Sequence, residues 1–268
     1  MRALTTAELL DAWERGMNRS VTEQALLLLG PACALSFDEL AALSIGRRDA
    51  LLLELRERMS GGQLVCVANC PACGERLELN FETAELLNDQ PSEASAPLQF
   101  HFAGYELSLR LPNSLDLMAI ATSADALIAR QQLLERCVLG GALDGEPVAT
   151  SRLPAAVIEA LTERLRRADP LADIQLALNC PACQHAWSAD FDIASFYLAE
   201  VGAWARRTLK EAHLLARAYG WTEQEIFSLS AWRRQFYLNC ISELNQTAQD
   251  RSSTARVSKR LFVIHTAC

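Results

Sequence analysis

The sequence of 268 residues has only two lysines, Lys210 and Lys259, and only four histidines. It contains no Gly-rich phosphate-binding loop, no nucleophile elbow and no pair of histidines at metal-binding spacing. These motifs mark nucleotide-dependent enzymes, serine hydrolases and zinc hydrolases. The sequence therefore predicts a protein that is not an enzyme and that has no small-molecule substrate.

Long apolar runs are missing as well. No stretch approaches the roughly 18 consecutive apolar residues of a membrane span. The N-terminal sequence MRALTTAELLDAWERG turns acidic and amphipathic where a signal peptide needs an apolar run. We therefore expect no membrane association and a cytoplasmic location.

The formal net charge of −8 is unevenly distributed along the chain. Residues 1–199 carry 15 basic and 27 acidic side chains, a net −12, whereas residues 200–268 carry 10 and 6, a net +4. Nucleic acid is repelled by the first part, and the question stays open for the C-terminal part.

Cysteine, by contrast, is plentiful, and its pattern is informative. Nine cysteines are an odd number, and four of them lie in two Cys-Pro-Ala-Cys turns. The segment NCPACGERLELNF (69–81) returns 110 residues later as NCPACQHAWSADF (179–191). Alternating strand residues follow each turn, so each segment predicts a strand-knuckle-strand hairpin.

One knuckle supplies only two of the four ligands that a structural zinc needs, so each needs a partner. We expect the two knuckles to share one zinc ion through Cys70, Cys73, Cys180 and Cys183. A redox role would require a helix directly after each turn, which the strand pattern disfavours. Loss of metal binding is the remaining alternative. His185 aligns with Glu75 of the first repeat and is expected to lie outside the coordination shell.

We predict an α+β fold that is mostly helical, with a split four-cysteine zinc ribbon in the middle and an inserted hairpin-plus-helices segment. Half of the residues are hydrophobic, so the 29.5 kDa chain can bury a core. The expected parts are an N-terminal helical unit (1–62), the split ribbon (63–82 and 172–192) with its insertion (83–171), a C-terminal helical unit (193–247) and a tail (248–268).

Local signals place further elements within these parts. Gly30-Pro31 predicts a helix end in the N-terminal unit. In the insertion, a hairpin turns at Ala103-Gly104, a helix is expected from Ser114 to about Leu139, and GGALDGEPVATS is expected to be a loop.

The C-terminal unit is rich in aromatic residues, and their helical spacing predicts that most belong to a core. Residues 222–241 also permit a helix-turn-helix with Arg233 and Arg234 exposed. A zinc-ribbon nucleic-acid-binding protein is therefore the alternative function. The scarcity of lysine, and of basic side chains beside both knuckles, weighs against it.

Three stretches resemble a known family: RLPNSLDL (110–117), DPLADIQLALNCPACQHAWSADFDIASF (169–196) and EAHLLARAYGWTEQEIFSLSAWRRQFYL (211–238). They are similar to the T-even-type phage baseplate hub assembly chaperones, a family that also occurs in phage-tail-like contractile injection systems. The likeness is densest from Arg110 to Leu238.

The resemblance implies a non-catalytic factor that binds hub or wedge proteins of a contractile-tail baseplate. It also implies a cytoplasmic location or incorporation into the assembled particle. On this basis the C-terminal helical unit is expected to provide the partner surface. The residues expected there are His213, Tyr219, Gly220, Trp221, Arg233, Arg234 and Tyr237.

Overall fold

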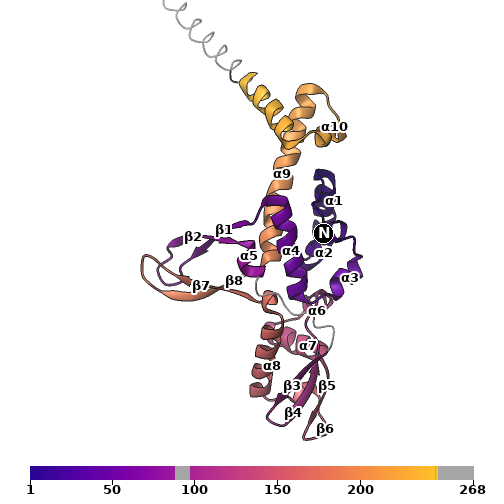
Figure 1. The fold of residues 1–268 in the computed structure, drawn as a ribbon, viewed down its shortest axis with the longest axis vertical. Helices are drawn as coiled ribbons and strands as arrows, with labels where there is room; N and C mark the ends of the chain where they lie inside the picture. Colours follow the sequence, from indigo (N-terminus) through magenta and orange to yellow (C-terminus); the bar gives the residue numbers. More distant parts are fainter. Residues whose placement is uncertain (88–96, 245, 247–268) are drawn as a thin grey trace, which may run out of the picture. The chain divides into compact units, whose positions relative to one another are not determined.

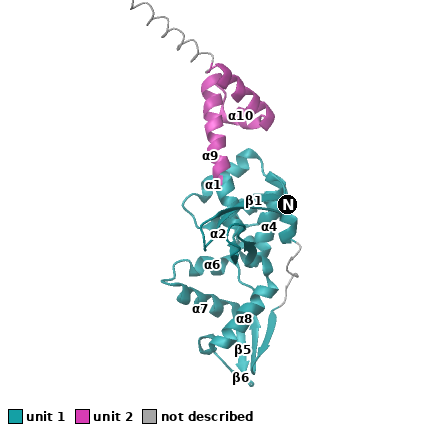
Figure 2. Cartoon of the chain, turned by 90° about the vertical axis from the view of Figure 1, so that its left-hand side faces the viewer, with its two compact units in different colours: residues 1–201 teal, residues 202–268 magenta. Residues whose placement is uncertain are grey.

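The computed structural model describes residues 1–87, 97–244 and 246 (Figure 1). The chain divides into two compact units, Met1–Val201 (unit 1) and Gly202–Cys268 (unit 2) (Figure 2). The fold is α+β and mostly helical with small sheets, as predicted. Within the described residues, no helix has the length and apolar character needed to cross a membrane. The predicted tail, 248–268, lies outside the described residues.

Unit 1 begins with four helices, whose starts follow from local sequence. The side chains of Thr5, Ser20 and Ser36 each accept a hydrogen bond from the backbone N–H three residues later. In each case the glutamate at that later position accepts a hydrogen bond from the backbone N–H of the capping residue. Such capping boxes satisfy backbone donors that the first helical turn leaves free. The helices are α1 (Thr6–Gly16), α2 (Val21–Cys33), α3 (Phe37–Ala42) and α4 (Ile45–Ser60).

The predicted helix end at Gly30-Pro31 is wrong. Helix α2 contains Pro31 and runs on to Cys33, and Ala34 then adopts a left-handed conformation with φ 55°. Pro31 is the third residue from the helix end, so its missing N–H removes only one hydrogen bond there. The core of these helices is built almost entirely from leucine and alanine, including Leu26, Leu29 and Leu52.

Two separate antiparallel hairpins follow the predicted pattern. Strands β1 (Gln63–Asn69) and β2 (Arg76–Glu82) pair along their whole length, and β7 (Ile174–Asn179) and β8 (Ala186–Phe191) do the same. Each hairpin is a two-stranded sheet of its own. Helix α5 (Thr83–Leu87) follows the first hairpin, and the rest of the insertion lies between the two.

The insertion contains a four-stranded antiparallel sheet in the order β3-β4-β5-β6. Its core consists of Phe100, Leu107, Leu109, Leu134, Leu153, Val157 and Leu161. The strands are β3 (Leu98–Phe102), β4 (Tyr105–Leu109), β5 (Val138–Leu143) and β6 (Glu146–Pro147). The helices are α6 (Ser114–Ile120), α7 (Ala126–Cys137), η1 (Thr150–Arg152), α8 (Ala155–Ala168) and η2 (Pro170–Ala172).

Two predictions for this segment are wrong. The single helix expected from Ser114 to about Leu139 is two helices followed by a strand, because Asp125 caps a new helix and Val138 begins β5. The expected loop is a hairpin that turns at Asp144-Gly145, where φ is 48° and 88°. Two consecutive positive φ values are typical of a tight hairpin turn, for which Asp-Gly is a preferred sequence.

One buried carboxylate joins three elements of the insertion. Asp116 in α6 has a fully buried side chain and accepts two hydrogen bonds from Arg110, at 2.6 and 2.7 Å, and one from Arg136 in α7, at 2.7 Å. It also accepts the backbone N–H of Asn113, completing a capping box. Burial alone would raise the pKa of Asp116, but these hydrogen bonds outweigh it and keep the pKa below its usual value.

We expect Asp116→Asn to lower the free energy of unfolding by about 3 kcal/mol at pH 7, because two guanidinium groups lose their counter-charge. A carboxylate with a lowered folded-state pKa stabilises above its unfolded pKa and loses that contribution as the pH falls through the folded value. The difference should therefore shrink below about pH 4. Urea unfolding at pH 7 and at low pH measures it.

The matched control is Asp11→Asn, which breaks an exposed pair with Arg15 at 3.5 Å. Exposed pairs contribute about 0–1 kcal/mol, so we expect almost no change there. Equal effects of the two substitutions would contradict the importance given to burial at Asp116.

Unit 2 contains residues 202–219 of α9 (Ile193–Tyr219), α10 (Glu223–Ser228) and a further helical segment, 231–244. Helix α9 ends before Gly220, whose φ is 71°, and Thr222 caps α10. The buried centre of the unit consists of Ala212, Leu215 and Ile226. Partly buried residues around it include Trp221, Phe227, Tyr237, Leu238 and Ile241.

Candidate metal centre

Each knuckle is a tight turn at the tip of its hairpin, held by the same two backbone hydrogen bonds. The N–H of Cys70 donates to Glu75 and the N–H of Gly74 donates to Cys70, at 2.8 and 2.9 Å. In the second hairpin Cys180 and Gln184 form the equivalent bonds, at 2.9 and 2.8 Å. Gly74 and Gln184 both have positive φ, 76° and 60°. The repeated sequence thus produces a repeated local structure.

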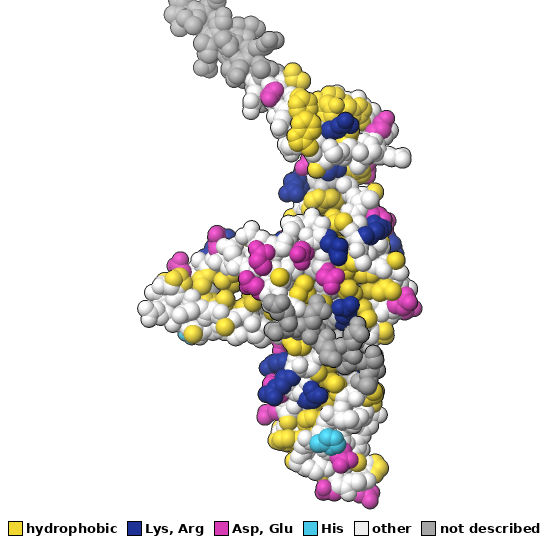
Figure 3. All heavy atoms as spheres, in the orientation of Figure 1, with side chains coloured by type: hydrophobic (Ala, Val, Ile, Leu, Met, Phe, Trp, Pro, Cys, Tyr) yellow, Lys and Arg dark blue, Asp and Glu magenta, His cyan; other side chains and the backbone are white. Residues whose placement is uncertain are grey.

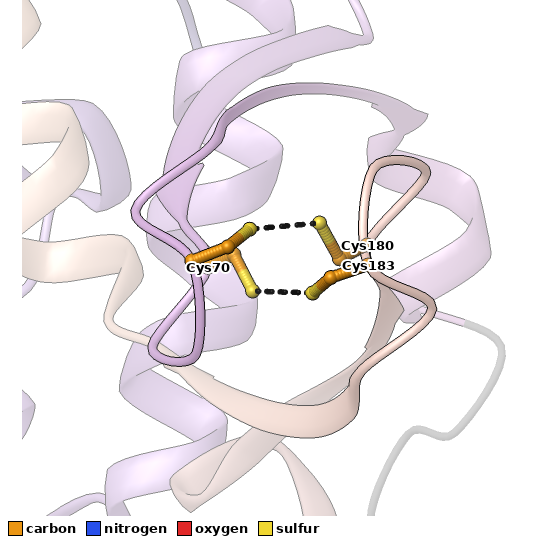
Figure 4. A group of neighbouring side chains, drawn as sticks. Cys70, Cys180 and Cys183 are labelled. Atoms are coloured by element: carbon orange, nitrogen blue, oxygen red, sulfur yellow. Dashed lines mark hydrogen bonds between the residues drawn. The ribbon is translucent and has the colours of Figure 1, made fainter.

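The structure brings the four predicted cysteines together. The Sγ atoms of Cys70 and Cys183 lie 3.7 Å apart, and those of Cys73 and Cys180 lie 3.6 Å apart. All four sulfurs lie within 4.8 Å of one another. Figure 4 shows the sulfurs of the two turns pointing toward each other. Four thiolates at about 2.3 Å from one tetrahedral zinc would be roughly 3.8 Å apart, so the spacing fits such an ion.

Burial differs within the group. Cys70 and Cys180 are buried, whereas Cys73 and Cys183 are exposed. The buried pair lies against Leu77, with Trp187 packed beside it. One side of the cluster is thus shielded by apolar side chains and the other faces solvent.

The four thiols influence one another's ionisation. At Cys70, burial disfavours the thiolate, but backbone N–H groups of the turn and the Cys183 thiol lower the pKa to about 7. At Cys73 a hydrogen bond from the backbone of Glu75 favours the thiolate, but hydrogen bonds with the thiols of Cys183 and Cys180, together with desolvation, outweigh it and raise the pKa to about 12. Four sulfurs so close together cannot all be anionic by themselves, and a divalent cation removes that repulsion.

Below the sulfurs, the two hairpins face each other through aromatic rings. Phe81 and Phe191 meet edge to face with centroids 5.4 Å apart, and Phe191 also contacts Phe196 at 5.5 Å. Phe81 and Phe191 are the phenylalanines that match between the two repeats, near the ends of β2 and β8. The two hairpins share no backbone hydrogen bonds with each other. Their contact is made by the aromatic rings and the cysteines.

Two neighbouring side chains are not part of the sulfur group. The ring of His185 stacks on Trp187, with centroids 6.0 Å apart. Cys66 lies on β1 and is half-buried, and burial raises the pKa of its thiol. The four-cysteine group therefore has no fifth ligand among the residues brought together here.

The residues expected to form a partner surface differ in their contacts and in their burial. Tyr219 and Trp221 stack at 4.7 Å, and both contact Tyr237, at 5.5 and 4.9 Å. His213 and Arg233 are exposed, but Arg234, expected to be exposed, is buried. Its Nε and Nη1 have no hydrogen-bond partner within the described residues.

Sequence analysis missed two exposed aromatic residues in this unit. Trp232 is 74% exposed and Phe236 is 51% exposed, and their rings stack at 5.8 Å. Their spacing of four residues was the available signal, because it places both on one face of a helix. The spacing alone does not say whether that face is buried.

Comparison with known proteins identifies a family. The family model described as T4 bacteriophage base plate protein matches residues 5–198. The match includes both cysteine turns and ends before unit 2, so the resembling stretch 211–238 lies outside it. Neither a curated protein nor a solved structure matches the chain.

Proposed function

The chain belongs to the T4 bacteriophage base plate protein family, and on this premise we propose that it is a non-enzymatic assembly factor or structural component of a contractile-tail baseplate hub. The tail is that of a phage or of a contractile injection system. The observation that supports this proposal most is the family match over residues 5–198. Its partners are hub or wedge proteins of the same baseplate.

We propose that Cys70, Cys73, Cys180 and Cys183 bind one structural zinc ion. A four-thiolate zinc has no open coordination position, so such an ion connects strands and does not activate water. The spacing of the sulfurs supports this assignment. In this proposal the ribbon (63–82 and 172–192) holds together the two ends of the inserted segment 83–171. The protein acts by binding other proteins.

The partner surface is assigned to unit 2, around His213, Tyr219, Trp221, Arg233, Arg234 and Tyr237. The proposal places the protein in the cytoplasm until it acts on the baseplate or is incorporated into it. Aromatic and arginine side chains are the residue types that contribute most to protein interfaces. The side chain of Arg234 is buried, so it contributes to this surface by supporting the residues beside it and not by contacting a partner.

The test is co-purification with the baseplate proteins of the same tail, expressed in the same cells. We expect the intact chain to recover at least one of them. Arg233→Ala removes an exposed side chain and should reduce that recovery several-fold while the circular dichroism of the chain stays unchanged. Trp221→Ala should reduce the recovery as well, together with some loss of stability, because Trp221 packs against the core of unit 2. Equal recovery with both variants would reject this surface, and recovery of no baseplate protein would contradict the proposed role.

A further inference from the structure

Five aromatic rings in unit 2 form a continuous series, which we call the aromatic track. Trp232 stacks on Phe236, Phe236 meets Tyr237 at 5.7 Å, and Tyr237 contacts Tyr219 and Trp221. One end of the track belongs to the core of the unit, through Trp221 and Tyr237. The other end is open: Trp232 is 74% exposed, Phe236 51% and Tyr219 38%.

Folding of unit 2 does not explain the open end. In helix 231–244 the buried face contains Arg234, with Leu238 and Ile241 partly buried on it. Trp232 and Phe236 lie one turn apart on another face of the helix. A large aromatic side chain that stays exposed does not gain the free energy that burial of its apolar surface would provide. Contiguous exposed apolar groups of this kind mark interaction sites. Figure 3 shows hydrophobic side chains gathered over unit 2, with basic side chains among them.

The charge beside the track indicates the chemistry of the occupant. Arg233 is exposed and lies three and four residues before Phe236 and Tyr237, so it adjoins both rings on the helix surface. Its guanidinium forms no hydrogen bond or ion pair in the part of unit 2 that is described. Of the four glutamates in residues 202–244, Glu211 pairs with Arg207 and Glu225 caps α10. None of the four glutamates pairs with Arg233 among the described residues, so its guanidinium is available to a carboxylate of a partner.

We infer that the aromatic track and Arg233 form the docking site for a segment of a baseplate protein that presents apolar side chains next to an Asp or Glu carboxylate. This inference rests on the proposed function and specifies the chemistry of its partner. Trp, Tyr and Arg at the centre of an interface contribute most of its binding free energy. Arg also binds a carboxylate through two parallel hydrogen bonds, which fixes the orientation of the partner.

Single-stranded nucleic acid also stacks on aromatic rings, but it requires several cations along its backbone. In helix 231–244 Arg233 is the one exposed cation beside the track, because Arg234 is buried. One cation on that helix does not provide the row of phosphate contacts that a nucleic-acid backbone needs. The observations therefore favour an acidic, apolar protein segment.

The test uses photo-crosslinking in the full-length chain, expressed together with the baseplate proteins of the same tail. Benzoylphenylalanine replaces Trp232 or Phe236, and the matched control is Phe102, a 42% exposed aromatic residue of β3 in unit 1. We expect crosslinks from positions 232 and 236 to one baseplate protein and none from 102. The crosslinked peptide should contain an Asp or Glu next to apolar residues.

Affinities for that baseplate protein then test the individual contacts. We expect Trp232→Ala to weaken binding about thirtyfold, the size of an interface hot spot, and Phe102→Ala to change it less than twofold. Arg233→Glu should weaken binding tenfold or more, and exchanging the partner's carboxylate for arginine should restore it. Arg233→Lys should retain part of the affinity.

The outcomes separate this inference from the proposed function. If the chain recovers a baseplate protein but positions 232 and 236 crosslink no better than 102, the docking site is wrong and the function stands. If no baseplate protein is recovered, the function itself fails. Salt-sensitive binding of a labelled single-stranded oligonucleotide, or self-association in sedimentation, that Trp232→Ala abolishes would overturn the inference in favour of nucleic acid or a second copy.

Discussion

A chain in which Cys70 is replaced by serine is expected to lose its metal ion and to lose about 5 kcal/mol or more of folding stability. Structural zinc contributes about 10–16 kcal/mol in small peptides at neutral pH, because the site exists only in the folded state. Here the ion would also connect Cys73 to Cys180 across 106 intervening residues, and closing such a loop costs roughly 4–5 kcal/mol. The binding free energy exceeds that cost.

The measurement combines elemental analysis with thermal unfolding of chain purified under reducing conditions. We expect about one zinc per intact chain, none in Cys70→Ser, and faster proteolysis between the two hairpins. Cys66→Ser is the matched control, because Cys66 lies four residues before Cys70, on β1, and outside the sulfur group. Its metal content should equal that of the intact chain.

Two results would contradict the zinc site. Intact chain without any bound transition metal would leave the four sulfurs as a thiol cluster. Equal loss of metal from Cys66→Ser and Cys70→Ser would show that the ion depends on the general fold and not on these ligands. Disulfides found under the same reducing conditions would support the redox alternative.

The split ribbon could be predicted because all of its information is local and is repeated. Each Cys-Pro-Ala-Cys turn is followed by alternating residues, and the offset of 110 residues aligns Phe81 with Phe191. The register of both hairpins follows from these segments alone. The only long-range step was to pair two half-sites, and the coordination chemistry of zinc supplies the reason for that step.

The inserted sheet was harder because its pairing is not local. Val138–Leu143 pairs along most of its length with Tyr105–Leu109, which lies about 30 residues earlier, and only at its end with the neighbouring Glu146–Pro147. Helical propensity of the preceding residues continues across Cys137 and conceals the boundary. The Asp144-Gly145 turn was a usable signal for a hairpin, but the residues after it are too few to show an alternating pattern.

Faces of the C-terminal helices were misjudged for a different reason. Periodicity identifies the two faces of a helix but does not say which face is buried when both contain aromatic residues. Arg234 was therefore assigned to the wrong side, because it is buried, and Trp232 is an exception to the expectation that most of the aromatic residues belong to a core. Only the packing of α10 and α9 in unit 2 decides between them.

Substituting Gly46 with alanine is expected to lower the free energy of unfolding by about 3 kcal/mol. The N–H of Gly46, in the first turn of α4, donates to Oδ2 of buried Asp169 at 2.9 Å. A Cβ at position 46 would lie 2.0 Å from Oδ1 of the same carboxylate. The side chain of Asp169 would have to move away, and the first turn of α4 would lose its acceptor. Losing a buried hydrogen bond to a charged group costs roughly 1.5–3 kcal/mol, and the steric conflict adds to it.

This contact joins residues 123 positions apart, so the sequence does not reveal that Gly46 must lack a side chain. Thermal unfolding of the whole chain measures the effect, and we expect the midpoint to fall by about 6–12 °C. Gly30→Ala is the matched control, because Gly30 is also helical and a Cβ there would have a carbonyl oxygen as its nearest neighbour, at 3.7 Å. Alanine favours a helix over glycine by about 1 kcal/mol, so Gly30→Ala should be neutral or stabilising.

A double-mutant cycle identifies the cause of the Gly46 effect. Asp169→Ala alone removes the acceptor and should destabilise the chain. Burial raises the pKa of the Asp169 carboxyl, and the hydrogen bond from the N–H of Gly46 lowers it in part. Once Asp169 is alanine, adding Gly46→Ala should cost much less, because the colliding carboxylate is absent and the backbone N of Ala172, at 3.1 Å, is the remaining close neighbour. Residues in direct contact couple by about 0.5–3 kcal/mol. Simple addition of the two single effects would mean that Gly46 is required for another reason.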